Sequence, residues 1–288
     1  MSAVTASGRS ADPRAANAEA IPLAVLGASG RMGGAVLARL AEFPALELRG
    51  AFTAPDSGLG GRDAGEVAGL GPLGVPLSER LDTALAGSRV AIDFTLADAV
   101  AGTAEACREA GVGLVCGVTG LDEAARAALR EAAKHVPVLW APNMSAGVAV
   151  LQRLAALAAA ALEDFDAGIY EAHHAAKRDA PSGTALALGR SVVAARGLPA
   201  EAALPDASLR AEGVDYAALR IGDVVGEHTV TLAGNGERME LSHRATDRAI
   251  FARGALRAAA WLAGKPPGFY ELADMLGLNR VDTSGAGQ

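Results

Sequence analysis

The chain has 288 residues, a hydrophobic content of 51% and a formal net charge of −7. This composition forms a packed core and excludes a mainly disordered chain, and the length corresponds to about two domains. The acidic balance argues against nucleic acid or an anionic membrane as a partner, and no uninterrupted apolar run reaches the ~18 residues of a membrane span.

The first half of the chain alternates short apolar runs with amphipathic stretches. Residues 1–20, rich in Ser, Ala and Arg, precede this pattern, and we expect a disordered tail there. Strands are then predicted at 22–26, 46–52, 89–94, 113–116 and 136–140, with helices at 32–43, 97–110 and 122–134. The glycine-rich segment 53–75 is predicted as a long loop with at most one short strand near Val75. This alternation predicts an α/β, Rossmann-like, doubly wound parallel sheet over residues 21–144.

The pattern changes in the second half, where strands follow one another without helical crossovers. Helices are predicted at 146–162 and 182–195, and strands at 167–173, 219–233 and 237–244. The last two strands are joined by Gly234-Asn235-Gly236, which is typical of a tight hairpin. We therefore expect a second, α+β domain with a mixed sheet over residues 145–253. Two final helices, 248–263 and 269–277, are predicted to return the chain to the first domain over residues 254–288.

A glycine-rich turn joins the first predicted strand to the first helix at residues 27–33. Gly27 suits the tight turn, Gly30 allows the backbone to approach a pyrophosphate at the helix N-terminus, and Gly33 allows close helix–strand packing. Their place after a strand favours dinucleotide binding over a simple βα turn. Arg31 either contacts a phosphate or lies on the surface.

The usual ribose-binding carboxylate is missing after the second predicted strand. The chain there has Ala54, and the first acid is Asp56. Without that carboxylate the sequence does not distinguish NADH from NADPH.

Only three of the 26 basic residues are lysines, namely Lys134, Lys177 and Lys265. Where arginine is used so widely, a remaining lysine marks a position that needs a compact, titratable ammonium. Lys134 and Lys265 are expected at the surface. The two cysteines, Cys107 and Cys116, have no metal or redox spacing and are expected to be buried thiols in a reducing compartment.

Lys177 belongs to the segment that is richest in chemical groups. His173 and His174 end a predicted strand, and Pro181 suits the first position of the next helix. At the start of that helix, backbone N–H groups and hydroxyls are offered by Ser182, Gly183 and Thr184. Two imidazoles, an ammonium and an anion-binding helix start predict a site that holds a small dicarboxylate and protonates it.

Three other interpretations of this segment compete with a dicarboxylate site. The histidines could be structural, or Ser182 or Ser145 could act in a hydrolase, although the chain has no nucleophile elbow. A metal site is not expected, because adjacent strand residues point to opposite faces and no third ligand stands at a suitable spacing. The remaining histidines are expected to be surface or sheet residues without a role: His135, His228 and His243.

Two further loops stand where open α/β sheets bind ligands, at the carboxyl ends of predicted strands. These loops are Gly117-Val118-Thr119-Gly120 and Ala141-Pro142-Asn143-Met144-Ser145. Each sequence alone is ordinary for a loop, so the expectation that these loops bind a ligand rests on their position.

From about residue 23 to residue 279 the chain resembles the 4-hydroxy-tetrahydrodipicolinate reductase family. The most specific element is His-His-x-x-Lys-x-Asp-Ala-Pro-Ser-Gly-Thr at 173–184. The resemblance also rests on Gly-Ala-Ser-Gly-Arg-Met-Gly (27–33), Ile-Asp-Phe-Thr (92–95), Gly-Val-Thr-Gly (117–120), Ala-Pro-Asn-Met-Ser (141–145), Glu-Ala-His-His (171–174), Asp-Ala-Pro-Ser-Gly-Thr-Ala (179–185) and Gly-Asp-Val-Val-Gly-Glu-His-Thr (222–229).

The resemblance implies a cytoplasmic homotetramer of lysine and diaminopimelate biosynthesis. It implies reduction of (2S,4S)-4-hydroxy-2,3,4,5-tetrahydrodipicolinate to 2,3,4,5-tetrahydrodipicolinate with NADH or NADPH, and release of water. His173 matches the proton donor or acceptor, Lys177 the proton donor, and His174, Gly183 and Thr184 the substrate contacts. The nucleotide contacts matched are Gly27, Ala28, Ser29, Gly30, Arg31, Met32, Gly117, Val118, Thr119, Ala141, Pro142, Asn143 and Met144; Arg248 and Phe251 align near the cofactor.

Three positions depart from the family pattern: Ala54 stands where many members carry the ribose-binding acid, Val118 replaces a common Thr, and Ala176 replaces a common His. Two rival functions remain at this point. One is a regulatory protein that binds NAD(P) without turnover, and the other is a different small-molecule reductase on the same scaffold. The intact His173 and Lys177 argue against a sensor, which needs no proton donor.

Overall fold

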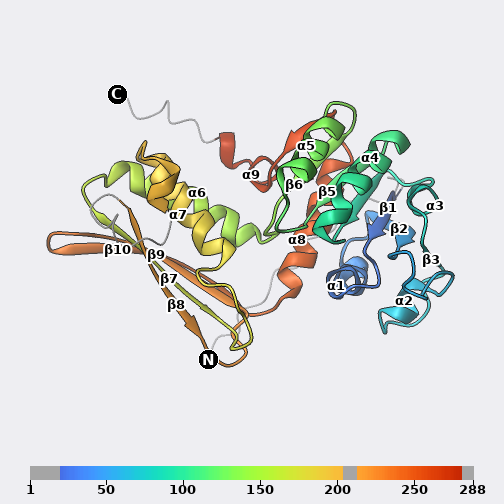
Figure 1. Cartoon of the computed structure of the whole chain (residues 1–288), viewed down its shortest axis with the longest axis horizontal. Helices are drawn as coiled ribbons and strands as arrows, with labels where there is room; N and C mark the ends of the chain where they lie inside the picture. Colours follow the sequence, from blue (N-terminus) through green and yellow to red (C-terminus); the bar gives the residue numbers. More distant parts are fainter. Residues whose placement is uncertain (1–19, 204–212, 281–288) are drawn as a thin grey trace, which may run out of the picture.

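The computed structural model describes residues 20–203 and 213–280 (Figure 1). Apart from Ala20, the expected disordered tail lies outside the described residues. The described chain builds two sheets, each with its own helices. No helix among these residues is both long enough and apolar enough to cross a membrane.

The first sheet has seven strands, all parallel, in the order β11-β6-β5-β4-β1-β2-β3. Its strands are β1 (Ile21–Leu26), β2 (Leu46–Phe52), β3 (Leu77–Ser78), β4 (Val90–Asp93), β5 (Gly113–Cys116), β6 (Pro137–Trp140) and β11 (Gly268–Tyr270). The strand order reverses between β1 and β4, because β2 lies on one side of β1 and β4 on the other. Ligands of doubly wound sheets bind at this switch point.

Helices cover both faces of the first sheet, as Figure 1 shows. Alternate residues of a strand point to opposite faces, so Leu23 and Val25 pack in one buried cluster and Ala24 and Leu26 in the other. The first cluster includes α1 (Arg31–Arg39), α8 (Ala249–Leu262) and α9 (Leu272–Met275). The second includes α3 (Leu81–Leu85), α4 (Val100–Ala110) and α5 (Glu123–Ala132).

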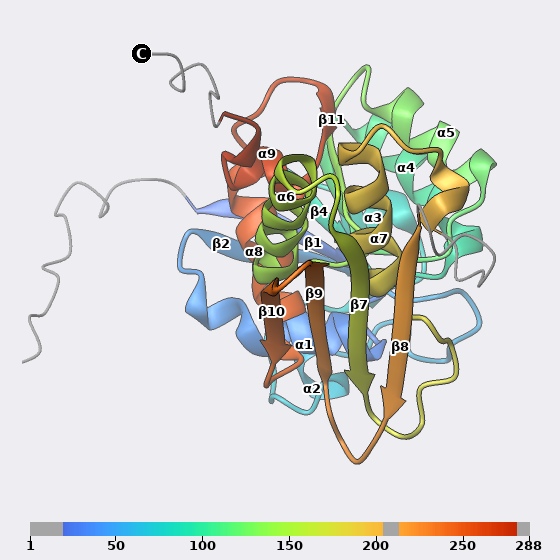
Figure 2. The ribbon, with the colours of Figure 1, turned by 90° about the vertical axis from the view of Figure 1, so that its left-hand side faces the viewer.

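The second sheet has four strands in the order β10-β9-β7-β8. Strand β7 (Asp166–His173) runs parallel to β8 (Val214–Arg220) and antiparallel to β9 (Gly226–Gly234), which forms a hairpin with β10 (Glu237–Ala245). Helices α6 (Ala146–Ala161) and α7 (Gly183–Ala195) lie behind this sheet in Figure 2 and pack on it. The predicted fold class, a doubly wound sheet with a second α+β unit, is confirmed.

Three predicted segments differ from the structure, wholly or in part. The strand predicted at 219–233 is two strands, β8 and β9, separated by a turn. The helix predicted at 269–277 is replaced by β11 and α9, because residues 268–270 pair with β6 at the sheet edge. The loop predicted at 53–75 is interrupted by the short helix α2 (Ala64–Val67), whose N-cap Asp63 accepts from two backbone N–H groups. The short strand expected near Val75 is β3, and α3, which was not predicted, follows it. Short 3₁₀ turns lie at Leu40–Glu42, Ala97–Ala99, Ala200–Ala203 and Leu278–Arg280.

The chain crosses between the two sheets at two places that lie in contact. The first crossing is the segment from Trp140, at the end of β6, to Ser145, the N-cap of α6. The second is the start of α8, where a Cβ on Gly254 would lie 1.8 Å from the carbonyl oxygen of Met144. Glycine at 254 therefore lets the returning helix touch the outgoing segment.

Gly33 and Gly34 form a matched pair for testing the packing of the glycine turn. A Cβ on Gly33 would lie 2.2 Å from the carbonyl oxygen of Gly27, whereas the nearest atom to one on Gly34 is Ala68 Cβ at 3.7 Å. We expect Gly33→Ala to lower the free energy of unfolding by about 1–3 kcal/mol through overpacking. Gly34→Ala is expected to raise it by about 0.5–1 kcal/mol, because alanine favours the helix.

Urea denaturation of the two variants, followed by far-UV circular dichroism, measures both changes. Equal effects of the two substitutions would contradict the close approach of α1 to the turn.

Candidate active site

The glycine turn lies at the switch point of the first sheet, between the ends of β1 and β4. Gly27 has a φ of +78°, and a Cβ there would lie 2.7 Å from the carbonyl oxygen of Phe94. Both features require glycine, so the tight turn predicted at this residue is confirmed. The ring of Phe94 also packs against Gly117, where a Cβ would lie 2.2 Å from the ring. Phe94 thus packs against two of the predicted nucleotide-binding loops, at Gly27 and at Gly117.

The N-terminus of α1 can receive an anion. Its N-cap, Gly30, supplies no side-chain hydrogen bond, and the first turn of the helix carries no acidic residue. The free N–H groups and the helix dipole therefore favour a phosphate at this position. Beside the turn, Ser29 Oγ lies 2.7 Å from Oγ1 of the buried Thr53, and Arg31 is exposed. This cradle fits the pyrophosphate of a nicotinamide dinucleotide.

The loop after β6 connects the two halves of the site. Asn143 Oδ1 accepts from the backbone N–H of Ser145, and Asn143 Nδ2 donates to Thr184 Oγ1 at 3.0 Å. Thr184 lies in the first turn of α7, in the second unit. A predicted nucleotide contact and a predicted substrate contact are therefore hydrogen-bonded to each other.

The second half of the site is organised around Glu171 on β7, which has no exposed surface. Its Oε1 accepts from the backbone N–H of Ser182 at 3.0 Å and from Arg220 Nη2 at 2.8 Å. Its Oε2 lies 2.7 Å from Nδ1 of His173. Burial raises the pKa of Glu171, but the Arg220 and Ser182 donors outweigh it and hold this pKa below its usual range.

Two imidazoles share this buried cluster. The rings of His173 on β7 and His228 on β9 lie edge to face with centroids 5.1 Å apart, and His228 Nε2 lies 3.2 Å from Ser182 Oγ. Burial lowers the pKa of His173, against the opposing charge of Glu171, and nearby Lys177 lowers it further. Burial and the charge of His173 lower the pKa of His228 to about 4. Both rings are therefore neutral near pH 7.

Lys177 follows β7 in a turn that places it near His173. Its Nζ pairs with Asp179 Oδ1 at 2.8 Å, and about a fifth of its side chain is exposed. Arg220 Nη2 also donates to the backbone carbonyl of Asp179 at 2.5 Å. The two sequence-predicted proton donors are thus linked through Glu171, Arg220 and Asp179.

The predicted substrate contacts divide into two groups. Ser182 is the N-cap of α7: its hydroxyl accepts from the Ala185 N–H and its own N–H is bound to Glu171, so it is buried and occupied. Pro181 precedes this cap and does not take the first helical position predicted for it. Gly183 is exposed, while Thr184 and His174 are half-buried, so these three remain open to a ligand.

Three residues of the cluster were missed by sequence reasoning: Glu171, Arg220 and His228. His228 is a sheet residue on β9, as expected, but its burial beside His173 was not expected. One signal was available for Glu171, because residues two apart on a strand share a face. His228 and Arg220 depend on the pairing of β7 with β9 and β8, which sets them opposite Glu171 and His173.

Glu171, His173 and His228 each offer one ligand atom, and these atoms lie within 4.8 Å of one another. Such a trio has the ligand types of a zinc site. However, the Arg220 guanidinium already compensates the carboxylate, and Lys177 adds positive charge nearby. A proton-transfer site agrees better with this charge balance, and the absence of a metal stays a prediction.

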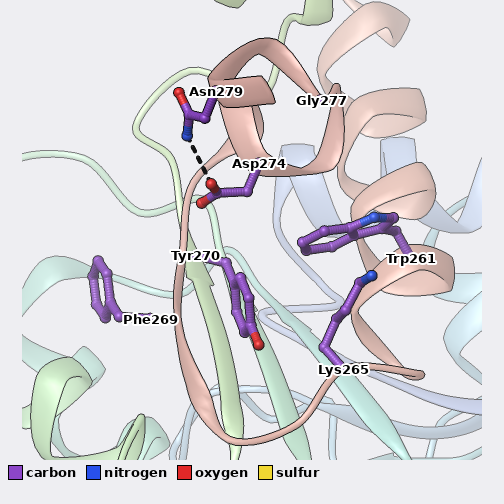
Figure 3. Close-up of a pocket in the computed structure, with 7 residues that line it drawn as sticks. All are labelled: Trp261, Lys265, Phe269, Tyr270, Asp274, Gly277 and Asn279. Carbon is purple, nitrogen blue, oxygen red and sulfur yellow. Dashed lines mark hydrogen bonds between the residues drawn. The ribbon is translucent and has the colours of Figure 1, made fainter. Parts of the chain in front are cut away.

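A separate pocket of about 390 Å³ lies at the β11 edge of the first sheet (Figure 3). Lys265 Nζ lies 4.3 Å from the ring centroid of Trp261, and Tyr270 packs edge-on against the same ring. Asp274 accepts from Asn279. These side chains already interact with one another, so fewer of their polar groups are free for a reaction than in the cluster on β7. The hydroxyls offered as hydrolase nucleophiles, Ser145 and Ser182, both cap helices.

A helix N-terminus open to an anion at the switch point, together with His173 and Lys177 in the second unit, is typical of a nicotinamide-dependent oxidoreductase. Two family models cover most of the chain: "Dihydrodipicolinate reductase, N-terminus" at residues 21–144 and "Dihydrodipicolinate reductase, C-terminus" at residues 147–276. The chain belongs to the dihydrodipicolinate reductase family, whose curated members are named 4-hydroxy-tetrahydrodipicolinate reductase.

Individual relatives agree with this assignment. The protein of that name from Alkalilimnicola ehrlichii is 47% identical over 263 residues, which are 89% of this chain and 98% of the relative. The one from Anaeromyxobacter dehalogenans is 50% identical over 261 residues, 88% of this chain and 97% of the relative. In fold, the chain is similar to a dipicolinate-bound dihydrodipicolinate reductase from Paenisporosarcina sp. TG-14, with a TM-score of 0.71, 23% identity and coverage of 88% and 98%.

The burial of His228 predicts a loss of stability in mild acid. Its pKa is about 4 in the folded protein and near 6.5 when unfolded, so the unfolded chain binds the proton first as the pH falls. The contribution of neutral His228 to the free energy of unfolding is complete above pH 6.5 and is lost as the pH falls toward 4. Between pH 7 and pH 5 this amounts to about 2 kcal/mol.

The measurement is urea denaturation of the wild type and His228→Gln at both pH values. We expect the wild type to lose about 2 kcal/mol more than the variant over this interval. The same pH dependence in both proteins would show that His228 is not buried in its neutral form.

Proposed function

We propose that the protein reduces (2S,4S)-4-hydroxy-2,3,4,5-tetrahydrodipicolinate to 2,3,4,5-tetrahydrodipicolinate with NADH or NADPH, in lysine and diaminopimelate biosynthesis. One hydride and one proton enter, and one water leaves. The observation that carries the proposal is the hydrogen bond from Asn143 to Thr184, because it brings the nucleotide loop of the first unit onto the substrate helix of the second. The hydride donor held by the first unit and the proton donors of the second unit then face one cleft.

In this proposal the first unit holds the nucleotide, which supplies the hydride when bound. The helix start at Gly30, the Ser29 hydroxyl and Arg31 receive its phosphates. The loops at 117–119 and 141–144 line the nicotinamide side, supported by Phe94 and by the hydrogen bond from Trp140 Nε1 to the carbonyl of Val118.

The second unit holds the substrate and moves its proton. The N–H of Gly183, an exposed residue, and the hydroxyl of Thr184, at the start of α7, bind a substrate carboxylate, and His174 is a further contact. The Lys177 ammonium stabilises negative charge that develops on the substrate nitrogen as the hydride arrives, and it donates a proton to the substrate. Neutral His173 exchanges a proton through its Nε2.

We also propose that the protein is a cytoplasmic homotetramer that assembles through the open face of the four-stranded sheet. Figure 2 shows α6 and α7 behind this sheet. Tyr170, Leu219 and Ile221, on or just beyond β7 and β8, are between 41% and 52% exposed, which is unusual for such large apolar side chains. The domain borders that accompany this proposal are 21–144, 145–253 and 254–288.

The function is tested by NAD(P)H oxidation with freshly prepared substrate, in the wild type and in two variants. His173→Ala is expected to lower kcat by ~10²–10⁴ with little effect on cofactor binding. Lys177→Arg is expected to be severely impaired although it keeps the charge, because a guanidinium does not readily give up a proton. Near-normal turnover of Lys177→Arg would show that this residue acts only as a charge. No oxidation by the wild type would favour the NAD(P)-sensing alternative.

The selectivity between NADH and NADPH is expected to be low. Ala54 stands after β2 where an acid would bind the ribose diol, and no basic residue lies between Ala51 and Gly61 to bind a 2′-phosphate. One charge-assisted hydrogen bond contributes ~1.5–3 kcal/mol, so the lack of both contacts leaves a small difference. We expect kcat/KM for NADH and NADPH to lie within about thirtyfold, ~2 kcal/mol. A preference beyond about a thousandfold in steady-state kinetics would contradict this expectation.

A further inference from the structure

Glu171 is a buried charged group to which the proposed reaction assigns no step. Its Oε1 is occupied by two donors, the backbone N–H of Ser182 and Nη2 of Arg220. Its Oε2 has one close neighbour of hydrogen-bonding type, Nδ1 of His173 at 2.7 Å; His228 Nε2 is farther, at 3.9 Å. This close contact does not have the full geometry of a hydrogen bond, and neither atom has a hydrogen-bond partner among the described residues. Such bonds often tighten when substrate binds.

This arrangement determines which nitrogen of His173 carries the proton. An ionised carboxylate only accepts hydrogen bonds, so Nδ1 must be the protonated nitrogen of the neutral ring. Nε2 then has a free lone pair. It faces Gly226 on β9, where a Cβ would lie 3.1 Å from Nε2, so glycine at this position leaves the nitrogen uncovered.

The surrounding residues fix both the carboxylate and the ring. Arg220 joins Glu171 to the carbonyl of Asp179, whose own carboxylate pairs with Lys177. The rings of His228 and His173 pack edge to face at an interplanar angle of 75°. The histidine and the lysine are therefore held by one connected set of contacts from β7, β8, β9 and the loop between β7 and α7.

We propose that Glu171 is the positioning residue that keeps the proton of His173 on Nδ1 and leaves Nε2 free to exchange a proton with the substrate. This proposal rests on the proposed reductase function for its catalytic consequence. The tautomer itself is a property of the substrate-free protein and can be measured without turnover.

Glu171→Gln is the decisive variant. The amide oxygen must still face the two donors from Ser182 and Arg220, so the amide NH₂ faces His173. Nδ1 then has to accept, and the neutral ring carries its proton on Nε2 instead. We expect ¹⁵N NMR of His173 at pH 8 to show Nδ1–H in the wild type and Nε2–H in the variant. The kcat of Glu171→Gln should fall by ~10²–10⁴ while the KM for the cofactor stays unchanged.

Two controls separate positioning from a structural effect. Glu163→Gln makes the same change on an exposed carboxylate just beyond α6 and should leave the tautomer and kcat as in the wild type. Glu171→Asp keeps the charge and should retain Nδ1–H, with a smaller loss of kcat than Glu171→Gln.

The proposal is overturned by Nε2–H in the wild type, which decides the matter even if Glu171→Gln does not fold. It is also overturned by a loss of kcat in Glu171→Gln with the Nδ1–H tautomer retained, or by a stoichiometric metal ion on Glu171, His173 and His228. If the wild type shows Nδ1–H and Glu171→Gln shows Nε2–H but the wild type oxidises no NAD(P)H, the proposed function is contradicted while the role of Glu171 in setting the tautomer is confirmed.

Discussion

The charge of Glu171 has to be compensated within the second unit, and this requirement arranges the proton-transfer side of the site. Removing a carboxylate from water costs several kcal/mol unless ion pairs and hydrogen bonds replace the lost solvation. Here Arg220 on β8, the N-terminus of α7 and His173 together supply that compensation. The pairing of β7 with β8 and the packing of α7 bring these groups to Glu171, the residue proposed to set the proton position of His173.

The nucleotide side depends on close backbone approach rather than on buried charge. Gly27 and Gly33 allow β1, β4 and α1 to meet at the switch point, and the N-terminus of α1 is left free for an anion. The two sides meet at Asn143 and Thr184, next to the crossing where Gly254 contacts Met144. In the proposed reaction, the hydride donor and the proton donor approach one substrate from different units of the fold.

The sequence predicted the parts of the site whose signals are local. The glycine turn and the His173–Thr184 segment each lie within about a dozen residues, and the spacing alone indicates their chemistry. Glu171, Arg220 and His228 come together only through the register of three strands, which no local pattern reports. The strand β11 was missed for a similar reason, since three residues at a sheet edge have too little periodicity to differ from a helix start.

A cleft shared between the two units is most directly tested by hydrogen exchange. The protein is compared alone, with NADH, with pyridine-2,6-dicarboxylate, a planar dicarboxylate, and with both ligands together. A shared cleft predicts that the two ligands together protect the amides of residues 117–120 and 171–184 in the same complex. Protection confined to the glycine turn at 27–33 would contradict it.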